Sequence, residues 1–254
     1  MNPVLEEIIK TRQVRPPDGG DPVPVHSAIS AEEGSFLQET VRRADPKISL
    51  EVGLAYGISA LYLCDALRIR EGTRHIVVDP MQNAIGDSDV FGNAWKGIGI
   101  ANLRRAGYGD IVHLIEKPSY RALAELEMAG QRIDFAFIDG FHTFDFALID
   151  FFYVDRMLQV GGIVTFDDTN WPALRRVCRF IVTNRAYRVE GSCGQDGVPW
   201  KGSVARNFLK ATPLARYCSQ EILRPNAELG IKGSCIAFRK EADDIRLWND
   251  FKDF

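Results

Sequence analysis

The sequence lacks both long hydrophobic runs and closely spaced cysteines. No apolar run approaches the roughly 20 residues that a membrane-spanning helix needs, and the N-terminal MNPVLEEIIK is too charged for a signal peptide. We therefore expect a cytoplasmic protein with no membrane partner. The five cysteines are scattered and include no CxxC pair, so the sequence indicates neither a disulfide framework nor a zinc site.

A strong charge imbalance is also absent. The chain carries 31 basic and 34 acidic residues, a net charge of −3, and has no long basic run, which argues against nucleic acid as a partner. With 254 residues, of which 46% are hydrophobic, the chain is long enough to bury one substantial core. We expect a single α/β domain that acts on a small molecule.

The most informative segment is ISLEVGLAYGIS, residues 48–59. Its alternating apolar residues predict a short buried strand with Glu51 near its end, and Gly53 and Gly57 predict a tight turn into a helix. Glycines let the backbone approach a ligand closely, and a carboxylate at a strand end can accept hydrogen bonds from a cationic or hydroxylated ligand. The segment therefore predicts a ligand cradle, although a purely structural turn has the same pattern.

A second strand is predicted at 75–79 and ends in Asp79, which comes 22 residues after Gly57. In a parallel sheet this carboxylate lies beside the glycine turn, where it could accept both hydroxyls of a ribose. The alternative is a carboxylate that only caps the end of its strand.

Strand and helix patterns continue to alternate along the chain. Further strands are predicted at 111–115, 132–139 and 163–166, and Gly161-Gly162 is predicted to end the helix before the last of these. Five such strand–helix units predict a doubly wound parallel sheet.

Acidic residues stand where three of these strands end, as Asp79, Asp139 and the pair Asp167-Asp168. Open α/β sheets bind ligands outside the carboxyl ends of their strands, so we expect these side chains to converge on one crevice. Carboxylates at this density need a cationic partner, such as a charged cofactor group or a divalent metal.

In these motifs the sequence resembles the class I S-adenosylmethionine-dependent methyltransferases. The segment from Glu51 to Gly57 is similar to their E/D-x-G-x-x-x-G cofactor loop, and Asp79 stands at the position of their ribose-binding acid. IDGFH at 138–142 and Asp167-Asp168 are similar to motifs of the catechol and sugar O-methyltransferase-like branch, which is methyltransferase family 24-like. The resemblance implies a Rossmann-like, doubly wound, mostly parallel seven-stranded sheet whose late strand is antiparallel.

The resemblance covers about residues 30–240 of one domain that we place at 1–254. Within it we expect an N-terminal arm or flap (1–30), a cofactor-binding core (48–183), a substrate-side insertion (187–232) and the late strand (233–240).

The resemblance also implies how the cofactor is held. Glu51 would bind the amino or nearby polar groups of S-adenosylmethionine, Asp79 its ribose and Ser119 its adenine. The full set of implied cofactor-binding residues is Glu51, Gly53, Tyr56, Gly57, Ser59, Asp79, Ser119 and Asp139.

A metal and a base are implied in the same way. Asp139, Asp167 and Asp168 would bind Mg²⁺ or another divalent cation, since such ions prefer oxygen ligands. Asp139 and His142 are the implied catalytic residues, with His142 as general base because imidazole titrates near neutral pH. The alternative for His142 is a structural role in which it caps the next helix and hydrogen-bonds Asp168.

These implications lead to an O-methyltransferase that acts on a hydroxyl of a small molecule of sugar, catechol or polyketide type. A nicotinamide-dependent oxidoreductase fits less well, because the loop reads G-x-x-x-G rather than G-x-G-x-x-G. A non-catalytic cofactor-binding module is the second alternative. We also expect that the chain could form a homo-oligomer in which the arm reaches a neighbour.

Overall fold

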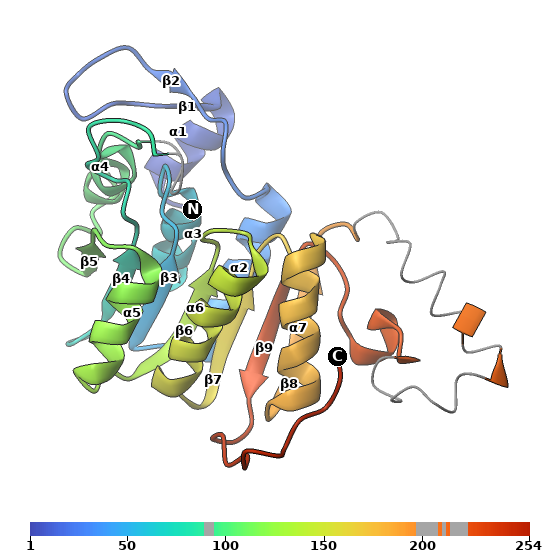
Figure 1. Cartoon of the computed structure of the whole chain (residues 1–254). Coiled ribbons are helices and arrows are strands. Elements are labelled where there is room, and N and C mark those ends of the chain that lie inside the picture. Colours follow the sequence, from blue (N-terminus) through green and yellow to red (C-terminus); the bar gives the residue numbers. More distant parts are fainter. Residues whose placement is uncertain (89–93, 197–207, 210–211, 214–222) are drawn as a thin grey trace.

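A seven-stranded sheet forms the centre of the structure, a computed structural model that describes residues 1–88, 94–196, 208–209, 212–213 and 223–254. Its strands are β3 (Ile48–Val52), β4 (Arg74–Val78), β5 (Val112–Ile115), β6 (Ile133–Ile138), β7 (Leu158–Phe166), β8 (Tyr187–Cys193) and β9 (Cys235–Lys240). Their order in the sheet is β5-β4-β3-β6-β7-β9-β8 (Figure 1). β9 runs antiparallel to both β7 and β8, and the other neighbours are parallel. The predicted mostly parallel sheet with an antiparallel late strand is thus confirmed.

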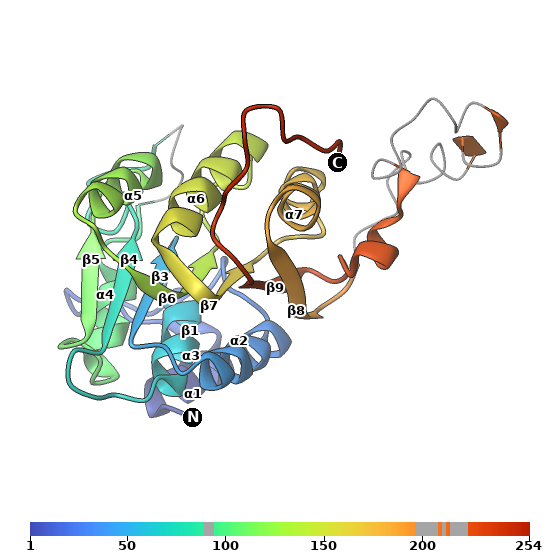
Figure 2. The same ribbon diagram turned by 90° about the horizontal axis from the view of Figure 1, so that it is seen from below.

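Helices cover both faces of this sheet (Figures 1 and 2). One face carries α1 (Pro3–Thr11), α2 (Ala31–Ala44), α3 (Ile58–Ala66) and α4 (Ile98–Arg105), and the other carries α5 (Ser119–Met128), α6 (Phe144–Met157) and α7 (Pro172–Asn184). Because strand side chains alternate, Leu50 and Val52 join the core under α5 to α7, whereas Val77 joins the core under α3. Two buried clusters therefore sandwich the sheet.

The N-terminal segment is more ordered than the flap that the sequence predicts. α1 begins with Asn2 as a capping side chain and buries Leu5 and Ile8 against α3. The two-residue strands β1 (Gln13–Val14) and β2 (Val23–Pro24) then pair around the glycine- and proline-rich turn. No helix in the described part of the chain is long and apolar enough to cross a membrane.

One predicted boundary is corrected. Gly161 and Gly162 lie inside β7 rather than before it, because the strand begins at Leu158 and the register against β6 shifts between Ile133 and Phe135. The predicted insertion at 187–232 begins with β8 and contains the 3₁₀ turn Asn226–Leu229. Its stretches 197–207, 210–211 and 214–222 lie outside the described residues.

Candidate active site

A cavity of about 420 Å³ opens at the carboxyl ends of the parallel strands. The backbone ties these ends together, since the Gly53 N–H donates to Val78 and the Asp139 N–H donates to Val52, each at 2.9 Å. The glycine turn and the acids therefore form walls of a single cavity. The predicted site residues that line it are Gly53, Tyr56, Ser59, Asp79, Ser119, Asp139, His142, Asp167 and Asp168.

Three residues of the glycine turn have a positive φ, namely Gly53, Ala55 and Gly57. Gly53 has a φ of 90°, and a Cβ atom at this position would lie 2.0 Å from the carbonyl oxygen of Asp139. Gly57 has a φ of 78° and precedes α3, where its backbone lies close to Gly99. Gly57 shapes the turn but is not part of the cavity lining, in contrast to the predicted contact.

Glu51 lies behind the cavity wall rather than in it. Its side chain is completely buried, accepts a hydrogen bond from the Ser59 hydroxyl and lies 3.0 Å from His75 Nε2. The alternation of β3 explains this position, since Val52 points toward α6 and the preceding Glu51 points toward α3. Glu51 is thus connected to the cavity through Ser59, which lines it, and a contact of Glu51 with a ligand stays a prediction.

Asp79 lies beside the glycine turn, as predicted. Its Oδ2 atom accepts hydrogen bonds from the backbone N–H groups of Leu54 and Ala55, both at 3.0 Å, and Oδ1 accepts one from Met81 at 2.8 Å. The carboxylate therefore holds the turn in place while it lines the cavity. Its binding to a ribose stays a prediction.

The N-terminal segment forms part of the cavity wall through residues 27–29. His26 fixes this segment to the glycine turn, because its Nε2 atom lies 2.5 Å from the Tyr56 hydroxyl. Trp95 packs against both rings, with centroid distances of 5.8 Å to His26 and 5.1 Å to Tyr56. No sequence motif indicates that Trp95 and residues 27–29 line the cavity.

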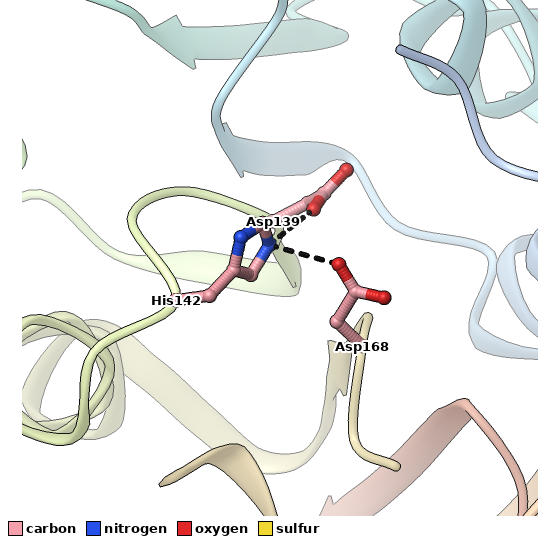
Figure 3. A group of neighbouring side chains, drawn as sticks. All are labelled: Asp139, His142 and Asp168. Atoms are coloured by element: carbon pink, nitrogen blue, oxygen red, sulfur yellow. Dashed lines mark hydrogen bonds and ion pairs between the residues drawn. The ribbon is translucent and has the colours of Figure 1, made fainter. Parts of the chain in front are cut away.

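On the opposite wall, His142 lies between two carboxylates (Figure 3). Its Nε2 atom is 3.1 Å from Asp139 Oδ1 and 3.2 Å from Asp168 Oδ2. Potential metal-ligating atoms of these three residues all lie within 4.8 Å of one another. Asp167 also lines the cavity, but His142 takes the place in this group that the sequence assigned to Asp167.

The comparisons with known proteins agree with this geometry. A family model described as a methyltransferase domain matches residues 50–169. This range includes the glycine turn and the acids Asp139, Asp167 and Asp168. The chain is 25% identical over 151 residues to a caffeoyl-CoA O-methyltransferase of Populus kitakamiensis, covering 58% of this chain and 57% of that protein. The chain thus spans little more than half the length of this relative.

Solved structures show the same fold. An O-methyltransferase from Bacillus cereus in complex with S-adenosylhomocysteine has a TM-score of 0.57 at 20% identity, covering 74% of this chain and 83% of that one. A Podospora anserina methyltransferase bound to S-adenosylhomocysteine has a TM-score of 0.55 at 20% identity, covering 95% and 89%. Over residues 50–169 the chain is thus similar to a methyltransferase domain, and its fold is that of these solved methyltransferases.

Burial and neighbouring charges raise the pKa values of the carboxylates in the acidic wall. Burial raises the pKa of Asp139, and the charges of Asp168 and Glu51 raise it further against the opposing effect of His142. Burial also raises the pKa of Asp167, with additional contributions from the charges of Asp139 and Glu33. The wall therefore gathers carboxylates that burial and their neighbours make costly to ionise.

The same carboxylates act on the pKa of His142. Burial alone lowers the pKa, but the hydrogen bond and charge of Asp139 together with the charge of Asp168 outweigh it, so the pKa is raised. The additional carboxylate on this wall is Glu33, which also belongs to the capping box of α2. Its N-capping contact, Ser30 N–H to Oε2 at 2.8 Å, is present as well.

Proposed function

We propose that the chain is an S-adenosylmethionine-dependent O-methyltransferase that methylates a hydroxyl of a small molecule. The observation that carries this proposal is one cavity with the glycine turn on one wall and the Asp139–His142–Asp168 group on the other. The relative named as a caffeoyl-CoA O-methyltransferase and the neighbour bound to S-adenosylhomocysteine support it.

We assign the cofactor to the wall formed by the glycine turn. Gly53, Tyr56 and Ser59 would surround the methionine end, Asp79 would accept the ribose hydroxyls and Ser119 would contact the adenine. Gly53 lines the cavity without a side chain, and Asp79 lies beside it, which supports this assignment. The negative charge of the opposite wall favours a cofactor that carries a positive sulfonium.

The acidic wall fits a divalent cation. Asp167 Oδ1 is buried and has no hydrogen-bond partner among the residues that the structure describes. Burial and neighbouring charges raise the pKa of both Asp139 and Asp167. We propose that Asp139, Asp167 and Asp168 hold the ion, since carboxylate oxygens are the ligands that Mg²⁺ prefers. When bound, such an ion lowers the pKa of an acceptor hydroxyl and orients it.

His142 is the side chain that we propose as the proton acceptor. The acceptor hydroxyl would lose its proton to Nε2 as its oxygen attacks the methyl carbon, so that a C–O bond forms while the S–C bond breaks. S-adenosylhomocysteine and the methyl ether then leave. Asp139 and Asp168, which lie within 3.2 Å of Nε2, would stabilise the imidazolium that results.

Replacing His142 by alanine should lower kcat by about 100- to 10,000-fold, which is the usual contribution of a positioned general base. Binding of S-adenosylhomocysteine should change little, because the predicted cofactor contacts lie on the other wall. Turnover is measured with an accepted hydroxyl substrate and binding by calorimetry. His113→Ala is the matched control, since His113 is exposed on edge strand β5. If His142→Ala weakened binding and turnover equally, the base role would be lost.

Calorimetric titration of the metal-stripped chain with S-adenosylhomocysteine tests the proposed function as a whole. We expect binding near one to one, and additional heat when Mg²⁺ is added before the titration. A parallel titration with NAD⁺ and NADP⁺ serves as the control, and no binding is expected. Binding of the nicotinamide cofactors alone would establish the oxidoreductase instead. Tight cofactor binding with no turnover across a broad set of hydroxyl acceptors would favour the non-catalytic module.

A further inference from the structure

β8 and β9 place two cysteines opposite each other. In the register of this antiparallel pair Cys193 faces Cys235, although residues 194–234 separate them in the sequence. Both are free thiols, and the Cys193 side chain is close enough to raise the pKa of the Cys235 thiol. Cα atoms of antiparallel partners are about 4.5–5.5 Å apart, and disulfides join Cα atoms about 4.4–6.8 Å apart. A disulfide can therefore form here with little backbone movement.

The cysteine pair lies directly behind the acidic wall of the cavity. Ser234, which precedes Cys235, donates a hydrogen bond to Glu33, and Glu33 lines the cavity. The charges of Asp167 and Glu33 also reach the Cys235 thiol. A chemical change at this pair would therefore occur next to the side chains that face the cavity.

The two thiols differ in accessibility. Cys235 is completely buried. Burial, the neighbouring Cys193 thiol and the nearby carboxylates raise its pKa well above the ordinary value. Cys193 is half-buried at the end of β8. Because exposed thiols are the ones that meet an oxidant, Cys193 is the sulfur that reacts first.

We propose that Cys193 and Cys235 form a redox modification site, in which a peroxide converts the two thiols into a disulfide. The Cys193 sulfur attacks the peroxide, so that an S–O bond forms, the O–O bond breaks and one water leaves. The Cys235 sulfur then displaces the second water from the sulfenic acid, and the S–S bond forms. One hydrogen peroxide and two thiols thus yield one disulfide and two waters.

Peptide mapping tests this site without relying on enzymatic activity. The full chain is treated with hydrogen peroxide, its remaining thiols are alkylated, and it is then digested and analysed by mass spectrometry. We expect a peptide pair joined between Cys193 and Cys235 that dithiothreitol separates. The oxidised chain should also have a Tm roughly 5–10 °C higher, because the crosslink restricts residues 194–234 in the unfolded state.

Three variants complete the test. Cys193→Ser and Cys235→Ser should each abolish the crosslink and the Tm increase, whereas Cys64→Ser should retain both, because Cys64 lies in α3. A crosslink from Cys193 to any other cysteine would overturn the proposal. So would a wild-type chain in which Cys193 becomes a sulfinic or sulfonic acid while Cys235 remains alkylatable, a result that does not depend on whether any variant folds.

Discussion

Replacing Gly53 by alanine should destabilise the fold by about 2–5 kcal/mol, which combines the left-handed backbone with steric overlap. The φ of 90° costs an alanine about 1–2 kcal/mol by itself. The added Cβ would also lie 2.0 Å from the Asp139 carbonyl oxygen, where the backbone cannot yield easily. Because any relief displaces Asp139, cofactor binding and turnover should fall as well. Urea unfolding measures the stability, and calorimetry with S-adenosylhomocysteine measures the binding.

Gly107 offers a matched control for this substitution. Its φ is 86°, close to that of Gly53, but no heavy atom lies within 4 Å of a Cβ placed there. Gly107→Ala should therefore cost only the backbone contribution of about 1–2 kcal/mol and leave cofactor binding intact. Equal losses in the two variants would show that the close approach of Gly53 to Asp139 is unimportant, and would remove the steric reason for a glycine in the turn.

Much of this site was predictable because it depends on where strands end. Hydrophobic runs locate the strands of a parallel sheet, and the residue after each run must then appear at one edge. Asp79, Asp139 and Asp167 were predictable for this reason, since each follows its strand directly. The neighbouring order of β3, β4 and β6 then brings the acids and the glycine turn to one cavity.

Side-chain direction was harder to predict than strand position. Glu51 was expected to face a ligand, yet it lies one residue before the end of β3 and points under α3. Its carboxylate there is bound by Ser59 and by His75 from the neighbouring strand. A sequence of nearly continuous buried residues does not show which face each one takes, because helices cover both faces of the sheet.

Contacts between distant segments could not be predicted at all. Glu33 carries the pattern of a capping box, and nothing in its neighbours in sequence shows that it also lines the cavity. The pairing of Cys193 with Cys235 depends on the register of β8 against β9, which includes a shift between Val189 and Gly191. A register of this kind is fixed by packing across the sheet and not by local sequence.

Asp150 shows how the interior of this fold depends on pH. The side chain lies on the buried face of α6 and is only 1% exposed. Among the described residues, neither of its carboxylate oxygens has a hydrogen-bond partner. Oδ2 would lie 3.5 Å from a Cβ on Gly140, the residue that follows Asp139. Burial raises the pKa of Asp150 to about 7, and the nearby Ser119 hydroxyl lowers it only in part. The folded state therefore favours the protonated acid.

Replacing Asp150 by asparagine should consequently stabilise the chain at alkaline pH. The rise in pKa from 3.8 to about 7 corresponds to about 4 kcal/mol. Because the folded-state pKa is the higher one, this stability is present below pH 4, declines as pH rises and is lost above pH 7. The asparagine side chain cannot ionise. The free energy of unfolding of the variant, measured with urea, should therefore rise relative to that of the wild type by up to about 4 kcal/mol between pH 4 and pH 8.

The same helix supplies a control of opposite sign. Asp145 is exposed, and the nearby Thr143 hydroxyl and the backbone at the start of α6 lower its pKa. Its ionised form is therefore favoured in the folded state. The free energy of unfolding of Asp145→Asn should not rise relative to that of the wild type as pH rises. A constant difference between Asp150→Asn and the wild type from pH 4 to pH 8 would mean that Asp150 stays ionised when buried. The interior between α5 and α6 would then hold a compensating charge or water that stabilises the carboxylate.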